Sequence, residues 1–172
     1  YTHDPSDPHS LSHRDVRCIY SDHEKNLWFA TVGGGLNLLS DRSSMRFKHY
    51  QRQKKSPDDL ATNAVLTLVE DHANVLWIGT YYGLTRFDRK TGTFRTFRYD
   101  PDDPSSLSHN WVYCLYEDSD HRLWVGTGGG LNLFNRTTNT FRRIGFKDGF
   151  LSNVINGILE DGRGRLWIST LD

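Results

Sequence analysis

The chain has 172 residues, and its 21 basic and 21 acidic side chains give a formal net charge of zero. It therefore has no basic field to hold a polyanion, which argues against general nucleic-acid binding. The mean hydropathy is −0.64 and no run of about 18 apolar residues occurs, which excludes a transmembrane helix in this sequence. Because the chain begins at Tyr1 rather than Met and shows no leader pattern, we expect a processed or excised piece of a longer protein.

The first ten residues are expected to be a connecting segment. Their pattern Asp-Pro-Ser-Asp-Pro at 4–8 returns as Asp-Pro-Asp-Asp-Pro at 100–104, directly after a predicted strand. We therefore interpret residues 1–10 as the tail of an outer strand from a preceding unit and the loop that follows it.

Residues 11–59 contain four short runs that are rich in aromatic and β-branched residues and are separated by turn-forming residues. Such runs are too short for helices and favour strands. The predicted strands are at about Val16–Ser21, Leu27–Thr31, Leu36–Leu39 and Met45–Tyr50.

The same unit then recurs along the chain. A Leu-Trp pair returns every 43 to 49 residues, at Trp28, Trp77, Trp124 and Trp167. Residues 60–106 and 107–150 form two further complete units, and residues 151–172 supply the first two strands of another. Repeats of four strands at this period are typical of β-propeller blades. We therefore expect an all-β fold of about 3.5 four-stranded antiparallel blades, with the first strand of each blade innermost.

The repeated string Glu-Asp-x-x-x-x-Leu-Trp-[Ile/Val]-Gly-Thr-x-x-Gly-Leu resembles the two-component regulator propeller repeat. It stands at 70–84 and 117–131, with a third copy at 160–170 in which Ser169 replaces the glycine. Unit one departs from it, with Ser21 in place of the glutamate. The resemblance implies the extracytoplasmic sensor region of a membrane histidine kinase, often a hybrid one, or of a related signalling receptor. It also implies that polysaccharide fragments are a common kind of ligand.

The repeated positions are best explained by architecture. A large apolar residue at one place in every blade fills the same gap, so the four tryptophans are predicted to pack between blades. One aspartate also recurs in every unit, and we expect it to cap the tight turn between the first and second strands. The recurring aspartates are Asp22, Asp71, Asp118 and Asp161.

Cys18 and Cys114 occupy equivalent places two blades apart. That separation exceeds the roughly 7 Å that a disulfide permits between Cα atoms, so we expect two free, buried thiols. The eight histidines show no recognised metal-ligand spacing, and no metal site or cofactor is predicted. His23, His72 and His121 fall in or near first-to-second-strand turns and are expected to be solvated.

Positions that break the repeat are better candidates for function. Trp111 stands where the other units have Asp15 or Ala64, and Tyr81-Tyr82 occupies a hairpin that is glycine-rich elsewhere. In a four-stranded blade, the loop into the first strand and the hairpin between the second and third emerge on one face. We therefore predict a ligand-binding surface on neighbouring blades, with blade one contributing at its edge. Its residues are Trp111, His109, Tyr81, Tyr82, Arg14 and His13.

Three functions remain open. The first, which the resemblance implies, is a non-catalytic, periplasmic sensing segment for a small molecule or oligosaccharide, without membrane contact of its own. The second is a protein-interaction or receptor-dimerisation scaffold, which includes a homodimer. The third is a propeller lyase or glycosidase. A glycosidase requires two carboxylates about 5 to 9.5 Å apart across the substrate, whereas the acids here lie mostly at repeated turn positions.

Overall fold

The computed structural model describes residues 2–53 and 59–171 and consists almost entirely of antiparallel strands. The first sheet contains β1 (Val16–Ser21), β2 (Leu27–Thr31), β3 (Gly35–Asp41) and β4 (Arg46–Tyr50). The second contains β5 (Val65–Glu70), β6 (Leu76–Thr80), β7 (Gly83–Asp88) and β8 (Thr93–Phe97). The third contains β9 (Val112–Glu117), β10 (Leu123–Thr127), β11 (Gly130–Asn135) and β12 (Thr140–Ile144). The fourth contains β13 (Ile155–Glu160) and β14 (Leu166–Thr170), preceded by the short 3-10 helix η1 (Phe146–Asp148).

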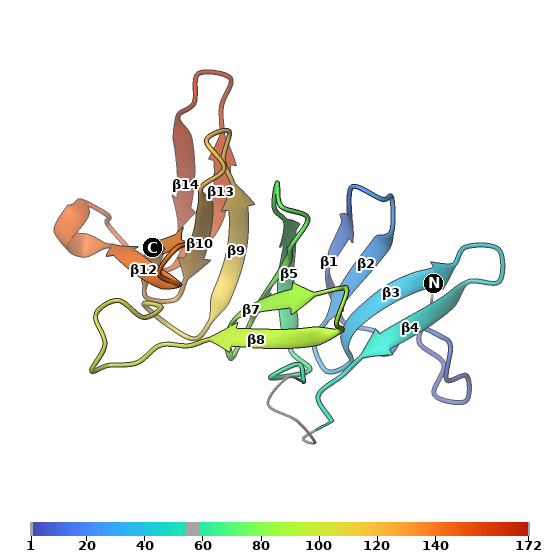
Figure 1. Cartoon of the computed structure of the whole chain (residues 1–172). Coiled ribbons are helices and arrows are strands. Elements are labelled where there is room, and N and C mark those ends of the chain that lie inside the picture. The colour runs from blue at the N-terminus through green and yellow to red at the C-terminus, as the bar shows by residue number, and fades with distance from the viewer. Residues whose placement is uncertain (1, 54–58, 172) are drawn as a thin grey trace.

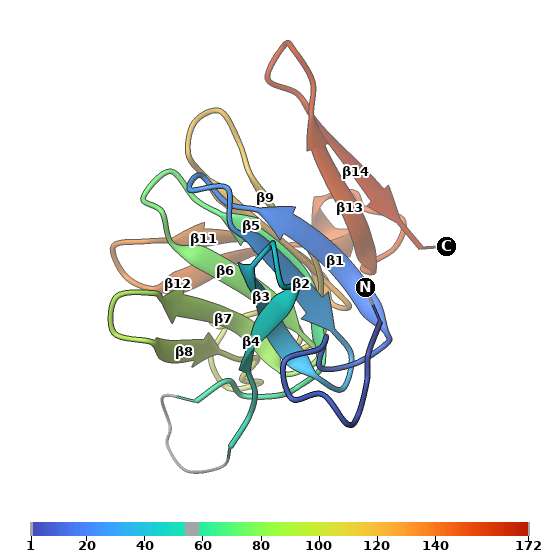
Figure 2. The ribbon, with the colours of Figure 1, turned by 90° about the vertical axis from the view of Figure 1, so that its right-hand side faces the viewer.

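Each four-stranded sheet is a meander in which consecutive strands pair, and the fourth sheet is a hairpin. The first strands β1, β5, β9 and β13 follow one another across the molecule, and each contacts the next (Figures 1 and 2). The predicted propeller architecture of about 3.5 blades is therefore confirmed, with the first strands neighbouring one another at the inner side. The strand bounds differ only slightly from those predicted, since β3 is longer and β4 begins one residue later.

One glycine in each complete blade is required by a close approach of two backbones. Gly35, Gly83 and Gly130 open the third strand with positive φ angles of 77°, 122° and 129°. A Cβ atom at any of them would come within 3 Å of a backbone carbonyl oxygen at the end of the fourth strand. The hairpin between the second and third strands can therefore close against the end of the fourth strand only with glycine at this position.

The tryptophans fill the junctions between blades, as predicted, wherever the described residues include strands of a following blade. Trp28 and Trp77 are each 2% exposed and Trp124 is 9% exposed. The Trp77 ring lies 4.9 Å from the ring of Phe134 in the third blade. Trp167 differs, with 59% of its surface exposed, because no described strand packs over that side of β14.

The opposite side of the first blade is also uncovered. Ile19 is 61% exposed, whereas Leu68 and Leu115, at the equivalent places, are 4% and 9% exposed because each packs against the preceding blade. The three-and-a-half-blade arrangement thus ends in two apolar blade faces. No helix in the described ranges has the length and apolar character needed to cross a bilayer.

Candidate functional site

The two segments that break the repeat lie at the same end of neighbouring blades, as predicted. Trp111 is in the loop that enters β9, and Tyr81 is in the hairpin between β6 and β7. The Gly83 N–H donates to the Asn110 carbonyl at 2.8 Å, which ties this hairpin of blade two to the loop of blade three. The backbone itself therefore holds the two segments together.

The aromatic rings of these segments contact one another. The centroids of Tyr81 and Trp111 are 5.8 Å apart in an edge-to-face arrangement, and those of His109 and Trp111 are 5.4 Å apart. Tyr113 of β9 adds a fourth ring, 6.4 Å from that of Trp111. Trp111 is 48% exposed and Tyr81 is 38% exposed. We call these four residues the aromatic cluster.

Tyr113 was absent from the sequence prediction. The equivalent residues are Arg17, Leu66 and Asn156, so the same comparison of units would have identified it. Burial, followed by the nearby Tyr81, raises the pKa of Tyr113 above its ordinary value. The phenol is therefore protonated at neutral pH and can donate a hydrogen bond.

His109 combines a structural contact with a free donor. Its Nδ1 accepts the backbone N–H of Trp111 at 3.0 Å, which places the proton of the neutral ring on Nε2. His13 makes the same bond to the N–H of Asp15 at 3.1 Å, so this histidine loop occurs in two blades. Each ring lies against a glycine of its own hairpin, Gly128 or Gly33.

The remaining predicted residues stand outside the cluster. The guanidinium of Arg98 covers the ring of Tyr82 at 3.7 Å, and Arg14 is exposed on blade one. Within the described ranges, no ring contact or ion pair joins His13 or Arg14 to Tyr81 or Trp111. The structure therefore brings together His109, Trp111 and Tyr81, and it leaves Tyr82, His13 and Arg14 as separate features of the same end.

The repeated aspartates cap their turns as predicted, and they also bind the tryptophans. Asp71 Oδ1 accepts the N–H groups of Ala73 and Val75, and its Oδ2 accepts the Trp77 indole N–H at 2.7 Å. Burial alone would raise the pKa of Asp71, but the hydrogen bonds from Trp77 and Val75 and the ion pair with Arg136 together lower it below its ordinary value. A fully engaged, buried carboxylate of this kind is unsuited to general acid or base chemistry.

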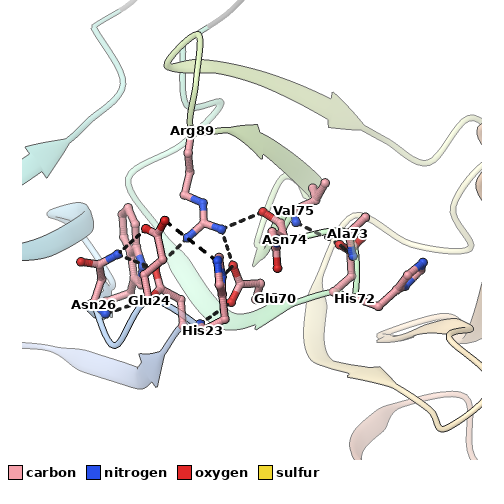
Figure 3. A network of polar contacts seen from close by, with 12 residues as sticks. His23, Glu24, Asn26, Glu70, His72, Ala73, Asn74, Val75 and Arg89 are labelled. Carbon is pink, nitrogen blue, oxygen red and sulfur yellow. Dashed lines mark hydrogen bonds and ion pairs between the residues drawn. The ribbon is translucent and has the colours of Figure 1, made fainter.

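Arginines and glutamates join consecutive blades at the end of the strands that carries the aspartate turns, opposite the aromatic cluster. Arg89, after β7, donates to Asp22 of the preceding blade at 2.7 Å and also to Glu70 of its own blade. Glu70 in turn accepts the backbone N–H of His23 at 2.7 Å (Figure 3). Sequence analysis missed these contacts, although an Asp-Arg or Asn-Arg pair at 41–42, 88–89 and 135–136 is itself repeated.

Both cysteines are free, as predicted, but they are half-buried rather than fully buried. The Cys114 thiol lies 3.6 Å from the carbonyl oxygen of Ile155, on the next blade. Burial raises the pKa of Cys114 to about 12 and also raises that of Cys18. Thiols held in this protonated form are poor nucleophiles.

One group of described side chains could hold a metal ion. Potential ligand atoms of His72, Glu117 and His121 all lie within 4.8 Å of one another. Both histidines are exposed, as predicted for turn residues. They are 49 positions apart, so no motif based on local spacing could have paired them.

These observations define the chain as part of a β-propeller with four-stranded blades, in which each blade carries the same Asp-Trp turn. Residues 10–33, 59–82, 106–129 and 149–172 match the two-component regulator propeller family, and the matches together span more than half of the chain. The chain therefore belongs to this family. No curated protein sequence matches it.

Solved structures show the same fold. The extracellular domain assigned to the hybrid two-component system BT3049 of Bacteroides thetaiotaomicron is 31% identical, with a TM-score of 0.80. The match covers 99% of this chain and 21% of that one. The BT4673 extracellular domain is 23% identical over 90% of this chain and 22% of that one, with a TM-score of 0.76. Virginiamycin B lyase from Staphylococcus aureus, at 15% identity and a TM-score of 0.62, shares the fold over 89% of this chain and 48% of its own.

Proposed function

We propose that this chain is a non-catalytic, ligand-sensing segment in the extracytoplasmic part of a two-component signalling receptor. Family membership and the 31% identity to the extracellular domain of BT3049 support this proposal. By the same likeness, the segment lies in the periplasm and the whole protein is anchored in the inner membrane. A kinase output belongs to the part of such a receptor that lies outside this chain.

The ligand is a small molecule or an oligosaccharide, and it binds on the aromatic cluster. The observation that carries this proposal is the exposed ring of Trp111. The equivalent positions of blades one and two hold Asp15 and Ala64, so the fold of a blade does not need a tryptophan there. Exposed aromatic faces stack on the apolar faces of sugars and on other amphipathic molecules. Packing of the propeller does not require this ring, whereas ligand stacking does.

Polar groups around the rings would orient such a ligand. The donors for sugar hydroxyls within the cluster are His109 Nε2–H and the hydroxyls of Tyr81 and Tyr113. Tyr82 with Arg98, and His13 with Arg14, lie farther along the same end. They would contact a longer chain, and the two guanidinium groups would favour a carboxylate on an acidic sugar.

Replacement of Trp111 by alanine tests the proposal. A panel of oligosaccharides is screened by calorimetry against the intact protein, and Trp111→Ala is then measured against each molecule that binds. We expect a loss of affinity of about 1–3 kcal/mol, which is roughly 5-fold to 150-fold, by analogy with aromatic stacking platforms. The melting temperature should hardly change, because Ala64 already fills the equivalent position.

Two further variants serve as controls. Trp111→Phe keeps a stacking face and should retain part of the affinity, and Lys90→Ala, in the β7–β8 turn at the other end of the blade, should retain all of it. Unchanged affinity in Trp111→Ala, or a panel in which nothing binds, would overturn the assignment of the cluster as a sugar site.

A second candidate is a protein-interaction or dimerisation scaffold. It is favoured by the exposed apolar side chains of Leu159, Trp167 and Leu171, which are 61%, 59% and 58% exposed on the last described blade. If this face acts as a scaffold in the intact protein, Leu159→Lys should weaken the assembly and leave ligand affinity unchanged. If Leu159→Lys leaves both the assembly and the ligand affinity unchanged, this face is not a scaffold and the sensing function stands alone.

A further inference from the structure

Two histidines and a glutamate meet at the junction between the second and third blades, at the end opposite the aromatic cluster. His72 comes from the β5–β6 turn, His121 from the β9–β10 turn and Glu117 from the end of β9. The two imidazole rings stack with centroids 4.3 Å apart, and the potential ligand atoms of all three residues lie within 4.8 Å of one another. We propose that this junction binds a divalent transition-metal ion, with Zn²⁺ as the first occupant to test.

Glu117 prepares His72 to act as a ligand. Glu117 Oε1 lies 2.6 Å from His72 Nδ1, and Oε2 accepts the His72 backbone N–H at 2.6 Å. An imidazole that donates through Nδ1 has its lone pair on Nε2, which is then free for a metal ion. A carboxylate behind a ligating histidine fixes the ring and increases its basicity.

Glu117 is assigned to orientation rather than to direct ligation. Its Oε1 also accepts a hydrogen bond from Arg136 Nη2 at 2.8 Å, so this oxygen already has two donors. The Arg136 guanidinium also pairs with Asp71 at 2.6 Å, so its positive charge is balanced by the carboxylates of Asp71 and Glu117. The metal ligands are therefore the two imidazole nitrogens, completed by water.

His121 is not required by the turn that contains it. Its φ of 61° matches those of Lys25, Asn74 and Gly164 at the equivalent positions, which are 66°, 60° and 74°. Four different residue types thus support the same backbone. The His121 side chain is exposed and makes no hydrogen bond to any residue in the described ranges, so its ring nitrogens are available to a ligand.

The donor set selects the class of ion. Imidazole nitrogen suits Zn²⁺, Cu²⁺ and Ni²⁺, whereas Ca²⁺ and Mg²⁺ take mainly oxygen ligands. With two protein ligands, the remaining coordination positions are open to water or to a donor from another molecule. An ion held by His72 and His121 would join two blades directly and should stabilise the folded junction.

The chain contains its own controls, because the three junctions carry different residues at the same places. The junction between blades one and two has His23 paired with Glu70 at 2.8 Å, but Asn74 replaces the second histidine. The junction between blades three and four has Ser119 bonded to Glu160 at 2.6 Å, with Gly164 as the third residue. Among the junctions between described blades, only the middle one has both imidazoles.

The experiment is a Zn²⁺ titration of the intact protein, freed of any affinity tag, by calorimetry, with thermal melting in Zn²⁺ and in chelator. His121→Asn and His72→Ser should each remove one equivalent of bound Zn²⁺ and its stabilisation. Both variants should fold, because Asn74 and Ser119 already occupy these places. Glu117→Gln should weaken binding about 10-fold to 100-fold, and Asn74→His should add one equivalent beside His23.

When Ca²⁺ replaces Zn²⁺ in the titration, we expect no heat of binding that depends on His121 and no thermal stabilisation that depends on it. The proposal is overturned if His121→Asn and His72→Ser bind as many equivalents of Zn²⁺ as the unaltered protein, or if that protein binds none. These readouts involve no sugar and no signalling activity, so they test the metal site independently of the sensing function.

Discussion

Trp77 makes two kinds of contact through one side chain. Its ring is packed in the core between blades two and three, with 2% of its surface exposed. Its indole N–H satisfies the buried carboxylate of Asp71 at 2.7 Å. Removing the ring therefore leaves a cavity and also takes one donor from a buried charge.

We expect Trp77→Ala to lower the free energy of unfolding by about 3–5 kcal/mol, as is usual for a large buried aromatic residue. Trp167→Ala is the matched control: the residue is equivalent but 59% exposed, and its loss should cost about 0.5 kcal/mol or less in this chain. Urea unfolding of both variants measures the difference. Equal costs would mean that burial between blades is not what the tryptophan provides.

At the scale of the strands and turns, each junction is held by charged groups as well as by apolar packing. Arg89 spans from its own blade to Asp22 of the preceding one, and Asp22 is fully buried at its side chain. Arg136 repeats this contact with Asp71. A buried carboxylate that loses one such partner keeps its desolvation cost, so these arginines should matter more than exposed ion pairs do.

Arg89→Ala should destabilise the protein by about 1–3 kcal/mol, because Asp22 keeps its bonds to Asn26 and Trp28 but loses its cation. Arg42 is the equivalent residue of blade one, and it donates a hydrogen bond to the carbonyl oxygen of Lys25 rather than to a carboxylate. Arg42→Ala should therefore have little effect in this chain. Thermal melts of the two variants make the comparison, and a loss for Arg42→Ala as large as that for Arg89→Ala would contradict it.

The strands were predictable because the same sequence pattern recurs in each unit. The Leu-Trp pair and the turn aspartate recur in all four units, and the glycine before the third strand recurs in the three complete ones, so all three features indicate one architecture. The contacts across junctions were not predictable in this way. The His72–His121 stack and the Arg89–Asp22 pair join residues 49 and 67 positions apart, and their geometry depends on how two blades dock. Departures from the repeat, such as Trp111, pointed to the aromatic cluster, but the exposure of its rings needed coordinates.

At the scale of the whole molecule, the two uncovered blade faces govern behaviour in solution. Ile19 is 61% exposed at one side, and Leu159 and Trp167 are 61% and 59% exposed at the other. Exposed apolar faces and free strand edges favour association. The isolated 172-residue chain should therefore self-associate as its concentration rises, in a way that sedimentation velocity can follow.

Charged substitutions on one face test the cause of that association. A Leu159→Lys, Trp167→Lys double variant should shift the equilibrium toward monomer, whereas Lys90→Ala should leave it unchanged. A chain that stays monomeric at every concentration would show that the uncovered faces are not adhesive.

The contacts between blades also have a direction, because the two faces of a blade carry different partners. We call the uncovered face of the first blade the head and that of the last described blade the tail. At the two junctions between complete blades, the contacts join unlike surfaces: an arginine from the later blade donates to the aspartate of the blade before it. On the first blade, Arg42 therefore contacts the Lys25 carbonyl and no aspartate of an earlier described blade. On the last described blade, Asp161 is bonded to Arg165 of its own hairpin and to no arginine of a later described blade. Contact between like faces cannot form these pairs, so copies of the chain should associate head to tail, in a heterologous rather than an isologous interface. Such an assembly ends as a closed ring if the rotation between copies divides the circle, and as a growing filament if it does not.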